Sequence, residues 1–326
     1  MLSALKGLFG TGKRPTLVNR LRPSDLEITS IALAPDDNHV AVGHNNGSIQ
    51  LVHITASTVT AEFRKSERSV QAIRFSRDGS KLAAAQYEYE VRVWDLATKE
   101  CVQMQGRTGR SLAFSPDSKL LAVGQHRGGS KAPDIEVFDV ASGNLLWTLH
   151  GHQESATYAA LASDVTAVEF SPDGTELISA GHDLHILVWP IPWKGGYSSL
   201  NADGITDAPQ NLRFSPEGSS ILADTTLYSD GKEAHTLRIW QSRKGPSRPI
   251  AVACESFIWD ARFSPDGSKA IAVSGKTLWL WDGGGKARKV GDNLSSVKRC
   301  FSPSGTRLAV AQSDASIEIW DVSNLY

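Results

Sequence analysis

The stretch GLFGTGKR near the start of the chain has the residue types that can hold a phosphate. Gly7, four intervening residues, Gly12 and Lys13 follow the spacing of a P-loop, in which backbone N–H groups and a lysine hold nucleotide phosphates. Arg14, however, stands where that loop needs a Ser or Thr for magnesium. Only six residues precede Gly7, whereas a working loop follows a buried strand and opens a helix. We therefore expect a glycine-rich leader and no cofactor.

Two groups of histidines have the residue types of a metal site or an acid–base site. His182 and His185 flank Asp183, but in an alternating strand the two imidazoles point to opposite faces, and Asp183 has the position of a turn residue. His150 and His152 share a face, yet no third ligand is near them in sequence. We expect no metal at either group. We also expect no enzyme activity, because the recurrent Ser and Asp residues belong to turns and no G-x-S-x-G elbow is present.

The composition is that of a globular protein with no strong overall field. The chain has 326 residues, 40% hydrophobic and 21% charged, with a formal net charge of -1. That balance gives no long-range attraction for nucleic acid or anionic membranes. Cys101, Cys254 and Cys300 are too few and too dispersed for a disulfide framework or a paired zinc spacing. With no signal-peptide core and no apolar run of ~18–20 residues, the sequence predicts a cytoplasmic protein.

A repeated turn divides the chain into seven similar units. In the full Pro-Asp-Gly form of the turn, Pro presets φ, Asp caps the turn and Gly takes a positive φ, so that two short strands are joined by a tight reversal. A third strand follows, often ending in Trp-Asp, and then a looser fourth strand. The seven turns are LAPDD (33–37), FSRDG (75–79), FSPDS (114–118), FSPDG (170–174), FSPEG (214–218), FSPDG (263–267) and FSPSG (301–305).

Four strands in ~40–45 residues with a Trp-Asp signature are typical of one propeller blade. Trp-Asp occurs at 94–95, 281–282 and 320–321, and Gly151 precedes His152. On these motifs the chain resembles the WD-repeat β-propellers. The resemblance implies an all-β fold in which residues 16–326 form a single seven-bladed β-propeller. Residues 1–15 are then expected to be a flexible or amphipathic leader.

The last unit is short by one strand. Only VSNLY follows Trp320 and Asp321, and an open ring would leave an unpaired sheet edge. The segment TLVNRL (16–21) comes before the first turn and has no partner of its own. We predict that it supplies the fourth strand of blade seven.

In the family, a network of His, Ser or Thr, Asp and Trp usually ties each blade together. Here blade four matches that pattern most closely, with His152, Ser179, Asp183 and Trp189. Blade one has Val52 at the Trp position. We therefore expect stability to depend more on apolar packing between blades than on buried polar networks.

The resemblance also implies that partners dock on the top rim, the face on which the first strand of each blade begins. Trp259 is the strongest candidate, because sister blades have Thr or Gln there and because Trp and Arg are enriched in binding hot spots. A role as a plug of the central channel stays open for Trp259. Blade seven is one residue shorter at this point, so the position of Lys298 is open. The predicted partner-binding residues are Trp259, Arg110, Gln71, Gln210, Lys298, Tyr87, Tyr89 and Tyr158; Thr29 and Thr166 align with them.

The opposite rim carries a possible basic patch on blades five and six, consisting of Arg243, Lys244, Arg248, Lys286, Arg288 and Lys289. A phosphate backbone could use it, so a nucleic-acid or nucleoprotein binder is the alternative function. The leading prediction is a non-enzymatic scaffold that presents top-rim loops to protein or peptide partners. It would be monomeric alone or one subunit of a hetero-complex.

Overall fold

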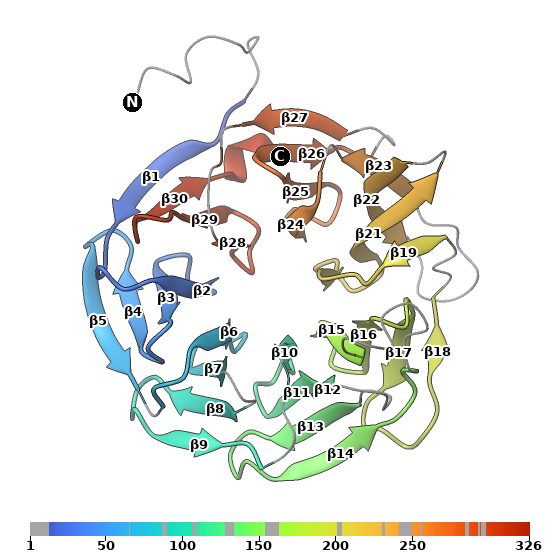
Figure 1. Ribbon diagram of the computed structural model, residues 1–326, viewed down its shortest axis with the longest axis horizontal. Coiled ribbons are helices and arrows are strands. Elements are labelled where there is room, and N and C mark those ends of the chain that lie inside the picture. The colour runs from blue at the N-terminus through green and yellow to red at the C-terminus, as the bar shows by residue number, and fades with distance from the viewer. Residues whose placement is uncertain are drawn as a thin grey trace.

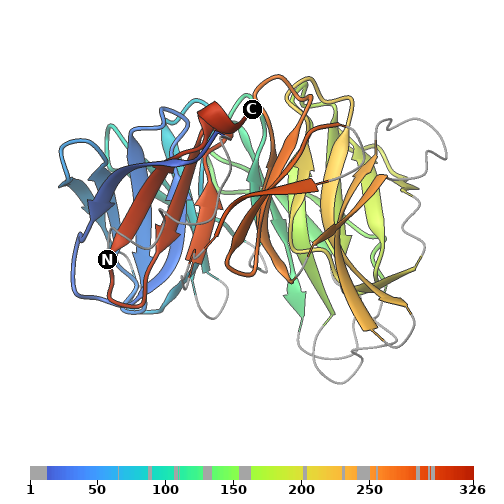
Figure 2. The same ribbon diagram turned by 90° about the horizontal axis from the view of Figure 1, so that it is seen from above.

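The computed structural model forms a ring of seven β-sheets around a central axis (Figure 1). It describes residues 13–64, 66–86, 90–105, 109, 111–127, 134–153, 163–200, 204–229, 232–240, 250–254, 256–283, 287–292, 294 and 298–326. The strands of each blade run between the two faces of the ring, so the connecting turns gather on those faces (Figure 2). The all-β, seven-bladed architecture predicted from the repeats is confirmed. No helix in the described residues is long and apolar enough to cross a membrane.

Four blades are simple antiparallel meanders whose first strand is innermost. Blade one contains β2 (Ile28–Leu33), β3 (His39–His44), β4 (Ile49–His53) and β5 (Thr58–Phe63). Blade two contains β6 (Val70–Phe75), β7 (Lys81–Gln86), β8 (Glu90–Asp95) and β9 (Cys101–Gln103). Blade three contains β10 (Ser111–Phe114), β11 (Leu120–Gly124), β13 (Ile135–Asp139) and β14 (Leu145–Leu149). Blade six contains β24 (Ile258–Phe263), β25 (Ala270–Ser274), β26 (Thr277–Trp281) and β27 (Ala287–Gly291).

Blades four and five carry additional strands. Blade four contains β15 (Ser163–Phe170), β16 (Glu176–Gly181), β17 (Ile186–Pro190) and β18 (Ser198–Ser199), and β12 (His126–Arg127) pairs with β15. Blade five contains β19 (Ile205–Asp207), β20 (Leu212–Phe214), β21 (Ile221–Ser229), β22 (Lys232–Trp240) and β23 (Ile250–Cys254). Both β19 and β20 pair with β21, which with β22 extends well beyond the other hairpins.

Blade seven joins the two ends of the described chain. It contains β28 (Lys298–Phe301), β29 (Arg307–Ala311) and β30 (Ile317–Asp321), followed by the 3₁₀ turn η1 (Ser323–Leu325). Its fourth strand is β1 (Thr16–Leu21), which runs antiparallel to β30 on the outside of the ring (Figure 1). Arg20 pairs with Glu318 across the two strands. The sheet edge of β30 is therefore covered by the first strand of the chain.

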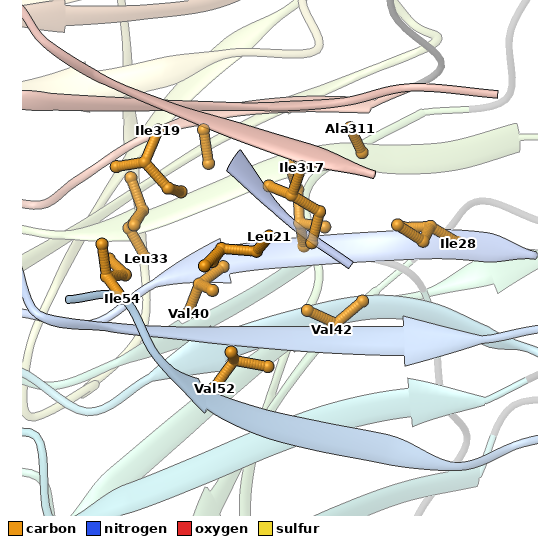
Figure 3. Close-up of a cluster of buried hydrophobic side chains, with 12 residues drawn as sticks. Leu21, Ile28, Leu33, Val40, Val42, Val52, Ile54, Ala311, Ile317 and Ile319 are labelled. Carbon is orange, nitrogen blue, oxygen red and sulfur yellow. The ribbon is translucent and has the colours of Figure 1, made fainter. Parts of the chain in front are cut away.

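The core is divided among the interfaces between blades. The described residues contain seven hydrophobic clusters, and each one joins two neighbouring blades. Figure 3 shows the cluster between blades seven and one, where Leu21, Ile317 and Ile319 meet strands of blade one. Val52, at the position where other blades have Trp, is 1% exposed in this cluster. Apolar packing thus joins every pair of neighbouring blades. That this packing contributes more to stability than the buried polar networks stays a prediction.

The repeated turns hold the inner strands in place. In blade three the Ser115 hydroxyl donates to Asp117 at 2.6 Å and accepts the N–H of Leu120 at 2.9 Å. The last residue of each turn has a positive φ, such as 72° at Gly174, which glycine adopts at no steric cost. Ser118 fills that place in blade three with a φ of 60°. The turn chemistry predicted from the motif is confirmed. These turns fix where the second strand of each blade begins.

Candidate functional site

The innermost strands enclose a channel of about 520 Å³ that is lined by residues of all seven blades. Among the residues predicted for the top rim, those that line this channel are Gln71, Gln210, Trp259 and Lys298, together with Thr29 and Thr166. The structure thus brings six positions from six different blades to one channel. Arg110, Tyr87, Tyr89 and Tyr158 lie outside the described residues, so their assignment to the top rim stays a prediction.

A β-bulge presents the rim residue in four of the blades. Ile258 pairs with Ser274 and Asp260 pairs with Val273, so Trp259 between them is an extra residue without a cross-strand partner. The same irregularity occurs at Thr29, Gln71 and Thr166. A bulge bends its strand and redirects a side chain, and bulges are common next to functional sites. The alternation of apolar and polar residues in these strands does not predict the bulge.

The register of blade seven shows to which residue of the other blades Lys298 corresponds, whereas Val297, four residues before Phe301, lies outside the described residues. Counting back from the Phe of the turn motif, Lys298 pairs with Ala311 in regular register, as Asp260 pairs with Val273. Lys298 therefore corresponds to Asp260 and not to Trp259. Lys298 is exposed and lines the channel. Its place in the strand is one residue after the position that Trp259 occupies in blade six.

Trp259 forms an exposed pair with a cation from the neighbouring blade. Its side chain is 48% exposed, and its ring packs edge-on against Phe257 with centroids 5.3 Å apart. The guanidinium carbon of Arg299 lies 5.1 Å from the Trp259 ring centroid, within the range of a cation–π contact. Arg299 also donates to the carbonyl of Leu294 at 2.7 Å. The Trp259–Arg299 pair is therefore held on both sides and still faces solvent.

The rim of blade five is anchored by a buried carboxylate. Asp224, on β21, is 5% exposed and accepts the backbone N–H of Gln210 at 2.9 Å and that of Asn211 at 2.7 Å. Burial raises the pKa of Asp224 to about 7, although these hydrogen bonds favour the charged form. A residue that the sequence did not single out thus positions Gln210, which is exposed on the rim.

Stability should consequently depend on pH through Asp224. Its ordinary pKa is 3.8, so between pH 3.8 and about 7 the folded protein keeps a proton that the unfolded chain has lost. The contribution of Asp224 to stability is then present at low pH and declines as the pH rises, by up to ~1.4 kcal/mol per pH unit. In urea titrations at about pH 5 and pH 8, Asp224→Asn should reduce the difference in unfolding free energy between the two conditions. Asp25→Asn changes an exposed carboxylate and should leave this difference in unfolding free energy unchanged. If the two variants behaved equally, the pH dependence would not come from Asp224.

The histidines of blade four have structural roles. His152 Nε2 lies 2.7 Å from the Ser179 hydroxyl, and Trp189 Nε1 donates to that hydroxyl at 2.8 Å. His152 Nδ1 lies 2.9 Å from Asp183 Oδ1, which confirms the predicted four-residue network. His185 contacts the carbonyl of Asp183 at 2.8 Å. Burial would raise the pKa of Asp183, but hydrogen bonds from His152 and from the backbone lower it below its ordinary value.

The predicted basic patch is only partly described. Arg288 and Lys289 are exposed on β27, and Lys289 Nζ lies 3.4 Å from a carboxylate oxygen of Asp292. Arg243, Lys244, Arg248 and Lys286 lie outside the described residues. No contact in the described part of this rim favours the alternative function as a nucleic-acid binder.

Comparison with known proteins agrees with the geometry of the ring. The family model "WD domain, G-beta repeat" matches residues 143–190, 248–282 and 289–321, which include β15–β17, β24–β26 and β28–β30. This chain is a seven-bladed β-propeller that contains WD repeats. A solved structure entitled "Crystal Structure of Mitotic Checkpoint Complex" contains a chain that superposes on the propeller with a TM-score of 0.75 at 17% identity. The match covers 97% of the propeller and 95% of that chain.

The curated relatives of the propeller are distant in sequence. Human "Apoptotic protease-activating factor 1" is 21% identical over 78% of this chain but only 19% of its own length. "Protein FIZZY-RELATED 3" of Arabidopsis thaliana is 23% identical over 78% of this chain and half of its own length. "Target of rapamycin complex subunit LST8" of Bos taurus is 24% identical over 74% of this chain and 73% of its own length. The chain thus spans about a fifth of the length of the first of these relatives and half of the length of the second.

Proposed function

We propose that the propeller, residues 16–326 as one domain, is a non-enzymatic scaffold in the cytoplasm that binds protein or peptide partners with its top rim. The observation that carries this proposal is the Trp259–Arg299 pair, a half-exposed aromatic ring and a cation fixed on neighbouring blades. Trp and Arg are the residue types enriched in hot spots of binding interfaces. Because strands hold the pair in place, a partner would lose little ordering entropy on binding it.

The comparisons support a role as a subunit of an assembly. LST8 is named as a subunit of the target of rapamycin complex, and the similar solved chain belongs to a structure titled as a complex. Neither likeness identifies the partner, since one fold serves many functions. We propose a protein that is monomeric alone and joins a hetero-complex through Trp259, Gln71, Gln210 and the other predicted rim residues.

Trp259→Ala tests the site. In affinity purification from the native host, the variant should lose the partners that the unchanged protein retains, and the binding of an identified partner should weaken by ~30-fold or more. Leu146→Ala is the matched control, because Leu146 is 44% exposed but lies on β14 at the outer wall of blade three. Retention of every partner by Trp259→Ala would reject the top rim as the binding surface.

A further inference from the structure

The central channel is basic although the whole chain is nearly neutral. The chain has a formal net charge of -1, yet the described residues that line the channel include six basic side chains and only two acidic ones. The basic residues are Arg74, Arg77, Arg213, Arg262, Lys298 and Arg299, and the acidic residues are Glu169 and Asp260. A narrow space lined by one sign of charge concentrates the field inside it and attracts ions of the opposite sign.

Three of these arginines occupy equivalent positions in different blades. Arg74, Arg213 and Arg262 each directly precede the Phe of the turn motif, on β6, β20 and β24. This register directs a guanidinium to the channel from blades two, five and six. In blades one and three the same position holds alanine, which leaves room beside the arginines.

The two carboxylates are committed mainly to Arg213. Its guanidinium lies 3.2 Å from Glu169 Oε2 and 3.5 Å from Asp260 Oδ1, whereas Arg262 is 3.9 Å from Glu169 Oε1. Asp260 also accepts the backbone N–H of Phe301 at 2.8 Å. The Arg74 guanidinium donates to the carbonyl of Ile73 at 3.0 Å. Three guanidiniums therefore share two carboxylates.

This arrangement leaves positive charge uncompensated inside the ring. Burial and repulsion from Arg213 lower the pKa of Arg74, and the same causes lower that of Arg262 to about 10. The buried Nε atoms of Arg213 and Arg262 have no hydrogen-bond partner among the described residues. Buried charges and unpaired donors are costly unless a counter-charge satisfies them. The neighbouring Cys300 does not provide one, because burial raises the pKa of its thiol to about 12.

We propose that the channel binds a compact phosphate-class polyanion between Arg74 and Arg262. The planar guanidinium matches phosphate oxygens in pairs, and a phosphate carries more charge than a carboxylate, as this channel requires. The channel volume of about 520 Å³ lies within the range of small-ligand sites. The phosphoryl group comes from a free phosphate compound or from a phosphorylated side chain of a partner on the top rim. The free compound can be tested without any partner, so its failure leaves the proposed scaffold function untouched.

Titration with pyrophosphate tests the proposal. In isothermal titration calorimetry, binding to the unchanged protein should weaken by ~100-fold in Arg74→Gln/Arg262→Gln, because two charged donors are removed. That double variant keeps the contacts of Arg213 with Glu169 and Asp260. Its Tm in phosphate-free buffer should equal or exceed that of the unchanged protein, since repulsion is relieved; if it fails to fold, Arg74→Gln alone is the variant to titrate. Arg22→Gln, an exposed surface arginine, makes the same type of charge change outside the channel and should bind as the unchanged protein does.

A second probe identifies the source of the phosphoryl group. A short phosphoserine peptide and its unphosphorylated form are titrated into the same variants. Binding of pyrophosphate that depends on Arg74 and Arg262 supports a free compound, and phosphate-dependent binding of the peptide supports a partner's side chain. Absence of binding by both probes, or equal loss in Arg22→Gln and the double variant, would overturn the channel site.

Discussion

Replacing Trp189 by alanine is expected to lower the free energy of unfolding by about 4 kcal/mol. Trp189 is 0% exposed in the cluster between blades three and four, and its Nε1 donates to the Ser179 hydroxyl at 2.8 Å. The substitution leaves a cavity and also deprives the network of Ser179 and His152 of one donor. Urea unfolding followed by circular dichroism should show a lower midpoint with an unchanged slope.

Trp259→Ala is the matched control for this prediction, because it removes the same side chain from an exposed position. Its unfolding free energy should change by no more than ~1 kcal/mol, since only the contacts with Phe257 and Arg299 are lost. Equal destabilisation by the two substitutions would mean that the blade-four network contributes nothing beyond surface packing. The same measurement shows that any loss of partners by Trp259→Ala does not come from unfolding.

Removing residues 1–21 should destabilise the whole ring, with a fall in Tm of more than ~10 °C and visible aggregation. The truncation strips β1 from β30 and uncovers the cluster that contains Ile317 and Ile319. An exposed strand edge then becomes a template for pairing with other molecules. Differential scanning fluorimetry and size-exclusion chromatography measure the two effects.

A truncation that removes only residues 1–12 keeps β1 and provides the baseline. Two point variants on β1 sharpen the test, since Leu21 is 2% exposed and Val18 is 42% exposed. Leu21→Ala should cost ~3 kcal/mol, and Val18→Ala should cost less than ~0.5 kcal/mol. If both truncations melted at the same temperature, pairing of β1 with β30 would not hold the ring closed.

The fold could be predicted because the repeated turn depends only on interactions between residues close in sequence. Ser, Asp and Gly act within five residues of one another, so each copy of the motif specifies its own reversal. Seven copies then imply the ring by simple counting. The Trp position of the third strand is buried even where Trp is absent, since Val52 of blade one is 1% exposed and Phe138 of blade three is 0% exposed.

The details of the rim could not be predicted in the same way. Lys298 pairs with Ala311 and so corresponds to Asp260, and in this register Arg299 lies beside Trp259. The pairing of β12 with β15 and of β19 with β21 arises in insertions that have no counterpart in other blades. Such contacts join residues distant in sequence, and a local motif carries no information about them. The basic channel was likewise hidden, because its arginines are spread over four repeats.

The pairing of β1 with β30 can form only late in synthesis, because the two strands lie far apart in the sequence. Arg20 and Glu318 face each other across 298 positions, so β1 leaves the ribosome long before the strand with which it pairs. At ~5–20 residues per second, translation keeps β1 waiting for tens of seconds while the intervening blades emerge. During that interval β1 has no strand to pair with, and Leu21, which is 2% exposed in the folded ring, has no blade-seven core to pack against. Slow codons late in the message would lengthen this vulnerable period.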